Sequence, residues 1–186
     1  MSMEKTKMSE DNTVVSFEKK QNKKPDVASY GQESFFSKGM YDWVMFVLNY
    51  YSRIKSTLKI DFESFVILQV VVSHSLYNLN KDGTKNFTEL ENDIISYRKN
   101  NKKKVEKLNI ASISDILQLP RETVRRKAIK LEKAEIIIIN SSDGIILGPA
   151  YKTVYREFVT QTTFDVGSLL NKWKNTGILN KFLEIK

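Results

Sequence analysis

Residues 112–147 carry three consecutive local patterns that strongly restrict how this chain folds. Ser112 is a suitable N-cap for a short helix, and Asp115 suits the second position of a capping box. A two-residue turn then leads to Pro120, and proline is favoured at the first position of a helix because its missing N–H is not needed there. We expect this second helix to run from Pro120 to Lys133.

The predicted helix at 120–133 has one apolar side and one basic side. On a helical wheel, three apolar positions form a narrow stripe: Val124, Ala128 and Leu131. The charged positions lie at or beside the opposite pole: Glu122, Arg126, Lys133, Arg125 and Lys130. The small Ala128 permits the close approach of the preceding helix that a helix-turn-helix requires. We therefore predict that the stripe is buried and that the basic side projects outward.

A β-hairpin pattern follows this helix. Four isoleucines at 136–139 precede a turn rich in Asn, Ser, Asp and Gly at 140–144, and a second apolar run occupies 145–147. We expect this hairpin to form a small wing beside the two helices. Its tip lacks lysine and arginine, so Ser141 and Ser142 are the candidates for hydrogen bonds to phosphate.

Positive charge is concentrated around the same helix. The twelve basic and four acidic residues between Arg98 and Lys133 account for the whole net charge of +8. Only six of the thirty basic residues are arginines, and three of the six lie in the helix at positions 121, 125 and 126. Arginine is the side chain whose planar fork suits guanine edges and phosphates. The local excess indicates a polyanionic partner.

The segment from Ser112 to Arg126 resembles a bacterial winged helix-turn-helix, and 121–126 is similar to the recognition helix of the catabolite activator class. The resemblance implies three residues that contact base edges: Arg121, Glu122 and Arg126. It also implies phosphate contacts from the same helix: Thr123, Arg125 and Lys130. We add Lys133, on the same helix face, and the two hairpin serines to the expected phosphate contacts.

The resemblance covers about 40 of the 186 residues and departs from the catabolite activator pattern in two respects. Pro120 stands where that class usually has a serine, which removes a hydroxyl contact to phosphate. No upstream segment resembles a cyclic-nucleotide β-roll, so control by cyclic AMP is not implied. The helical stretch from Phe35 to Tyr97 is closer to the helical frame of MarR-like regulators.

We predict a mainly α fold with a small β-hairpin wing: a winged helix-turn-helix with helical N- and C-terminal extensions. The expected parts are a disordered polar tail at 1–34, a helical frame at 35–109, the DNA-binding unit at 110–148 and C-terminal helices at 149–186. We expect a break in the C-terminal helical pattern near Thr162 and another near Gly177. These last helices either complete the core of the monomer or form a dimer interface.

The predicted helix at 35–58 is apolar over much of its circumference. Its main stripe recurs at three- and four-residue steps: Met40, Val44, Val47, Leu48, Tyr51, Ile54 and Leu58. The simplest interpretation is that this stripe packs into the core of the same chain, and the alternative is a dimer interface. Asp61 is the expected N-cap of the next helix, which should run to about Asn78.

Several classes of function are disfavoured. The chain has no cysteine, which excludes disulfides, thiolate zinc sites and a cysteine nucleophile. Its single histidine, His74, has no companions at metal-ligand spacing. No constellation of catalytic residues or Gly-rich phosphate loop is present, so we expect neither an enzyme nor a cofactor. The absence of a long apolar segment predicts a cytoplasmic protein without membrane contact.

The leading hypothesis is a sequence-specific transcriptional regulator that binds double-stranded DNA as a homodimer, with the helix at 120–133 in the major groove. Two alternatives remain open. One is a plasmid or phage replication or partition factor, whose DNA-reading units share this architecture. The other is a winged-helix module that binds only protein. The sequence identifies neither a target site nor a small-molecule effector.

Overall fold

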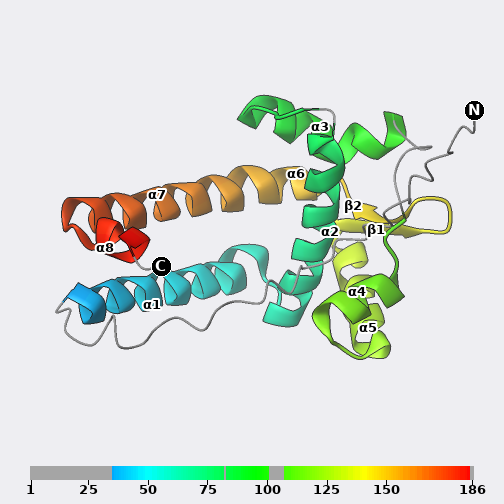
Figure 1. The fold of residues 1–186 in the computed structure, drawn as a ribbon. Coiled ribbons are helices and arrows are strands. Elements are labelled where there is room, and N and C mark those ends of the chain that lie inside the picture. Colours follow the sequence, from blue (N-terminus) through cyan, green and yellow to red (C-terminus); the bar gives the residue numbers. More distant parts are fainter. Residues whose placement is uncertain (1–34, 82, 101–106, 185–186) are drawn as a thin grey trace, which may run out of the picture.

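The computed structural model describes residues 35–81, 83–100 and 107–184 (Figure 1), so the predicted polar tail at 1–34 lies outside the described residues. The described chain is mainly helical with one two-stranded antiparallel sheet, which confirms the coarse fold prediction. The elements follow in this order: α1 (Phe35–Arg53), η2 (Ile54–Leu58), α2 (Phe62–Asn80), α3 (Phe87–Asn100), α4 (Ile110–Leu117), α5 (Arg121–Lys133), β1 (Ile137–Asn140), β2 (Gly144–Leu147), α6 (Tyr151–Val154), η3 (Tyr155–Val159), α7 (Thr160–Asn175) and α8 (Ile178–Glu184).

The helices form two groups that meet at α2 (Figure 1). We call α1, α7 and α8 the arm, because α1 and α7 lie side by side and α8 packs against both. We call α2 to α5 and the sheet the head, in which α2 contacts α3, α4, α5 and β2. Figure 1 shows α5 and the hairpin at the end of the molecule opposite to the arm.

The main hydrophobic core lies in the head and is built around α2. It contains buried residues from α2, α4, α5 and both strands, including Val71, Ile113, Val124 and Ile137. A second, smaller cluster joins the arm to the head and consists of Ile54, Leu58, Phe65 and Phe158.

The start of α2 follows the sequence prediction. The Asp61 carboxylate accepts a hydrogen bond of 2.9 Å from the Ser64 amide, so Asp61 is the N-cap. The helix continues to Asn80, two residues beyond the expected end.

No single described helix is long and apolar enough to cross a membrane, and the stretches 35–58 and 62–80 meet that test only together, as a pair bent by 89°.

The α1 helix differs from the simplest expectation. Eight large apolar side chains on it remain 38–64% exposed: Met40, Tyr41, Trp43, Val44, Met45, Val47, Leu48 and Tyr51. We call this set the α1 apolar face. The interpretation that the predicted stripe packs into the core of the same chain is therefore wrong for its first five members, although Ile54 and Leu58 are buried. The residues of α1 that are buried are Gly39 and Asp42.

Close packing explains why α1 turns the side with Gly39 and Asp42 toward the rest of the arm. A Cβ atom on Gly39 would lie 2.8 Å from the Phe182 ring of α8, so a larger residue would require this ring to shift. The buried Asp42 carboxylate accepts a hydrogen bond from the Lys172 ammonium of α7, and Arg53 forms an ion pair with Asp165. Polar cross-links, a glycine and ring contacts of Phe182 with Phe35 and Trp173 therefore hold the arm together, and the α1 apolar face remains largely exposed.

The C-terminal third contains one of the two expected breaks. The prediction of a break near Thr162 is wrong, because α6, η3 and α7 form a continuous helical run through that position. The Thr162 hydroxyl donates to the Phe158 carbonyl at 2.7 Å and so remains compatible with helix. The break at Gly177 is confirmed, since this glycine adopts φ 75° between α7 and α8.

Candidate nucleic-acid interface

The turn between α4 and α5 is fixed by one buried serine. The Ser114 hydroxyl donates to the Leu119 carbonyl at 2.6 Å, and the Leu119 amide donates to the Ser114 carbonyl at 3.2 Å. Between them, Gln118 takes the left-handed conformation with φ 55° and ends α4. These contacts close the short turn and set α5 against α4.

Both predicted helix starts are shifted. Asn109, in extended conformation, is the N-cap of α4 and accepts a hydrogen bond of 2.9 Å from the Ser112 amide, so the prediction of Ser112 as cap is wrong. Asparagine caps as well as serine does, and the helix begins as soon as a cap is available. Pro120 is the residue before α5 and not its first helical residue, with ψ 136°. Its carbonyl accepts the first helical hydrogen bond, from the Val124 amide at 3.1 Å.

The inward side of α5 follows the prediction closely. Val124, Ala128 and Leu131 are all buried and belong to the main core. They help pack α5 against α2, α4 and β1. Because Ala128 carries only a methyl group, the helix backbone can approach its neighbours closely.

Lys127 is a buried cation that the sequence analysis did not single out. Its ammonium lies 2.6 Å from an Asp61 carboxylate oxygen and 3.1 Å from a Glu63 oxygen, both at the start of α2. Hydrogen bonds to these carboxylates raise the pKa of Lys127. Burial alone would raise the pKa of Asp61, but the hydrogen bonds from Lys127 and the Ser64 amide lower it to about 2. The pair stays ionised and ties α5 to α2.

The outward side of α5 carries the predicted contact residues. Arg121, Arg126, Lys130 and Lys133 are exposed, and within the described ranges none of them forms an ion pair. Glu122 and Arg125 are also exposed but pair with each other at 2.8 Å. Thr123 is half-buried. The helix therefore presents four uncompensated cations and one internally neutralised pair to solvent.

The hairpin has the predicted position and a well-defined turn. Ile137 pairs with Leu147 and Asn140 with Gly144, which leaves residues 141–143 at the tip. The Ser142 hydroxyl lies 2.7 Å from an Asp143 carboxylate oxygen and is engaged within the turn, whereas the exposed Ser141 side chain has no recorded hydrogen bond in the described part of the chain. Of the two predicted serines, Ser141 is therefore the one whose hydroxyl has no hydrogen-bond partner among the described residues.

A cation from another segment lies at this tip. The Lys107 ammonium is 3.4 Å from the Ser141 carbonyl oxygen, and the Ile145 amide donates to the Leu108 carbonyl at 2.8 Å, so this segment runs beside β2. A Cβ on Gly144 would lie 2.3 Å from the Leu108 oxygen, and with φ +74° this position requires glycine. The sequence signal for Lys107 was its place in the basic stretch 98–133, but the contact across 34 residues was not foreseeable.

The structure thus collects most of the predicted residues on α5 and places Ser141 and Ser142 on the neighbouring hairpin, with Lys107 in contact with the hairpin tip. Among the residues described here, no group of three or more His, Cys, Asp and Glu side chains could hold a metal ion. Comparisons of the chain with protein-family models, with curated proteins and with solved structures found no match.

Proposed function

We propose that this protein is a winged helix-turn-helix regulator that binds double-stranded DNA with α5 in the major groove. The observation that carries the proposal is the division of α5 into a side buried on α2 and a side with four exposed cations that lack ion-pair partners among the described residues. The B-DNA major groove is wide enough for such a helix. The hairpin with Lys107 and Ser141 provides a second contact to the backbone.

The two kinds of contact have different roles in this arrangement. Arg121 and Arg126 are suited to bidentate hydrogen bonds with guanine, and Glu122 can accept from cytosine once Arg125 turns to a phosphate. Lys130, Lys133, Thr123 and the hairpin contact the backbone and hold the helix in register. Lys127 takes no part in DNA binding, because Asp61 and Glu63 already bind its ammonium.

A salt series tests whether the chain binds DNA at all. Fluorescence anisotropy with a labelled random duplex should show an association constant that falls about 10²–10³-fold between 50 and 200 mM salt if about four to six phosphates are contacted. Lys130→Ala should make the slope of the log association constant against the log salt concentration shallower by about 1. Lys38→Ala removes the same charge from the exposed surface of the arm and should leave the slope unchanged. No measurable binding at low salt would refute the proposal.

We also propose that the regulator is a homodimer joined through the arm. Eight large side chains at about half exposure offer roughly 700 Å², taking about 180 Å² for a fully exposed one. That approaches the roughly 800 Å² that each partner contributes to a standard interface. Two members of this face, Tyr41 and Met45, also line a groove of about 370 Å³ between α1 and α7. Dimers of such readers contact two half-sites about one helical turn apart.

Sedimentation tests the dimer independently of DNA. The double substitution Val44→Asp and Leu48→Asp places two charges in the α1 apolar face and should convert the dimer to a monomer. Ser37→Asp, on an exposed position at the start of α1, is the control and should leave the dimer intact. A wild-type chain that sediments as a monomer at tens of micromolar would refute the dimer and leave the DNA proposal standing.

A protein-binding role is the second candidate, and one observation favours it. Ile129 of α5 is 41% exposed and Ile138 of β1 is 37% exposed, so the outer surface of the head is not wholly polar. Isolated exposed apolar residues are common on protein surfaces and do not by themselves indicate a partner. The salt series separates the two functions, because a protein-binding module has no reason to bind a random duplex.

A further inference from the structure

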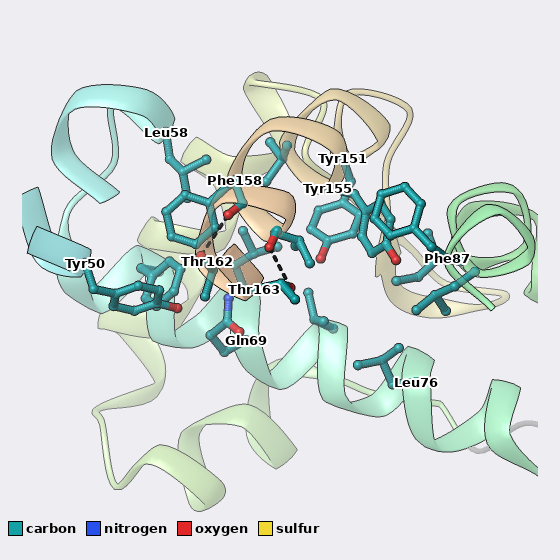
Figure 2. Close-up of a pocket in the computed structure, with 17 residues that line it drawn as sticks. Tyr50, Leu58, Gln69, Leu76, Phe87, Tyr151, Tyr155, Phe158, Thr162 and Thr163 are labelled. Atoms are coloured by element: carbon teal, nitrogen blue, oxygen red, sulfur yellow. Dashed lines mark hydrogen bonds between the residues drawn. The ribbon is translucent and has the colours of Figure 1, made fainter. Parts of the chain in front are cut away.

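A cavity of about 410 Å³ lies between the end of α1, the helices α2 and α3 and the run from α6 to α7 (Figure 2). Figure 2 shows side chains from these helices converging on it, with Gln69 and Leu76 on α2 opposite Tyr151 and Tyr155. Its volume falls in the range of roughly 300–1,000 Å³ that is typical of small-molecule sites. The cavity shares α2 with the surface on which α5 packs, so it lies one helix away from the proposed DNA-reading helix.

The walls of the cavity are apolar, aromatic and uncharged. None of the seventeen described residues that line it is an acid, a lysine, an arginine or a histidine. Two charged side chains on the helices that line the cavity already have partners, since Arg53 pairs with Asp165 and Glu91 with Arg156. A charged ligand would lose its hydration here without gaining a counter-ion. The cavity therefore excludes phosphates, carboxylates and ammonium compounds.

Two largely buried tyrosines in the wall have hydroxyl groups without a protein hydrogen-bond partner among the described residues. Tyr151 is 3% exposed and Tyr155 is 4% exposed, and neither hydroxyl forms a hydrogen bond within the described part of the chain. Buried tyrosine hydroxyls normally find a partner. The two threonine hydroxyls of this wall are engaged, because Thr162 and Thr163 donate to backbone carbonyls of their own helix (Figure 2).

Both tyrosines stay protonated. Burial raises the pKa of Tyr151 and of Tyr155, and the nearby Glu91 charge raises the pKa of Tyr155 further. Each phenol therefore remains a hydrogen-bond donor at neutral pH and can donate to an acceptor in the cavity. The rings of Phe87 and Phe158, which also line it, offer flat apolar surfaces to a ligand.

We propose that this cavity is a binding site for a neutral, mainly apolar ring compound whose oxygen accepts hydrogen bonds from Tyr151 and Tyr155. Ring stacking against the aromatic walls supplies most of the affinity, and the two phenols select for the acceptor oxygen. The site is separate from the proposed DNA interface, and its test does not depend on DNA binding.

The probe for the test is 6-propionyl-2-(dimethylamino)naphthalene, a neutral two-ring dye with a ketone oxygen whose emission shifts to the blue in apolar sites. The wild-type chain should bind it saturably, with one dye per chain. Tyr151→Phe and Tyr155→Phe remove one donor each without changing shape and should each weaken binding about threefold to tenfold. Tyr41→Phe makes the same change on the exposed α1 apolar face and should have no effect.

A second variant tests the volume of the cavity. Leu76→Trp fills the space from the α2 side and should abolish saturable binding, with helicity and melting temperature measured to verify folding. The proposal is overturned if the dye does not bind saturably, or if both phenylalanine variants bind it as tightly as wild type. It is equally overturned if the anionic dye 1-anilinonaphthalene-8-sulfonate competes for the same site with equal or higher affinity.

Discussion

The substitution Lys127→Met isolates the ion pair that joins α5 to α2. The Lys127 ammonium lies 2.6 Å from Asp61 and 3.1 Å from Glu63. Methionine keeps a long apolar stem in the same space but removes the charge, so packing is preserved while two carboxylates lose their common cation. The expected result is a lower free energy of unfolding with no change in the Asp61 cap, because the Ser64 amide uses the other carboxylate oxygen.

The burial of Lys127, Asp61 and Glu63 determines how much the free energy of unfolding should fall. Lys127 is 11% exposed, Asp61 39% and Glu63 48%. Breaking a fully buried pair costs about 3–5 kcal/mol and losing an exposed pair about 0–1 kcal/mol. We therefore expect a loss of about 2 kcal/mol. Lys130→Met makes the same chemical change at an exposed position of α5 and should stay within about 0.5 kcal/mol of wild type.

The destabilisation caused by Lys127→Met should become smaller as the pH falls. The folded chain holds the pKa of Asp61 at about 2, below the roughly 3.9 of an unperturbed aspartate. A lowered pKa gives a stabilisation that is complete above the unfolded value and is lost as the pH falls through the folded value. By pH 3 about half of the Asp61 contribution should be gone.

Urea unfolding followed by circular dichroism measures the loss of free energy of unfolding and its dependence on pH. The measurements compare wild type and the two methionine variants at pH 7 and pH 3. The destabilisation by Lys127→Met should shrink at the lower pH, while Lys130→Met should stay neutral at both. A loss below 0.5 kcal/mol at pH 7, or a loss that is the same at pH 3, would show that the contact does not stabilise the fold as argued.

Three further predictions concern the interface and its supports. Arg126→Ala should weaken binding to a site selected from a random duplex pool by about 1–3 kcal/mol more than binding to random DNA, measured by anisotropy; equal losses would make Arg126 a phosphate contact. Asn109→Ala should lower the free energy of unfolding by about 1 kcal/mol and Ser112→Ala by much less, and the reverse order in urea melts would contradict the cap assignment. Gly144→Ala should cost more than about 2 kcal/mol, because its Cβ meets the Leu108 carbonyl; a melting temperature like that of wild type would contradict this clash.

The features that sequence reasoning predicted correctly are those that depend on neighbours along the chain. The buried stripe of Val124, Ala128 and Leu131 follows from the helical period alone, and the hairpin follows from β-branched runs around a turn. The Asp61 cap is likewise a local signal. The start of α4 was wrong by three residues and the start of α5 by one, because helix boundaries are less sharply encoded than helix interiors.

The features that could not be predicted depend on residues far apart in the sequence. Lys127 has the composition of a surface residue, and only its partners 66 residues upstream explain its burial. Lys107 reaches the hairpin tip across 34 residues. Periodicity identified the apolar side of α1, but it does not say whether the same chain covers that side. The cavity has no local signature either, because its lining comes from four separate segments.

The Asp61 carboxylate divides its two oxygens between two tasks, since one caps α2 through the Ser64 amide and the other binds Lys127 on α5. This division limits how the position can change over evolution. Asparagine at 61 would keep the cap and lose the charge, and Glu63 would then be the remaining carboxylate in the ion pair with Lys127. Related sequences should therefore vary at 61, 63 and 127 together. In chains that lack these charges, the apolar contacts and the hydrogen-bonded turn between α4 and α5 must fix the orientation of α5.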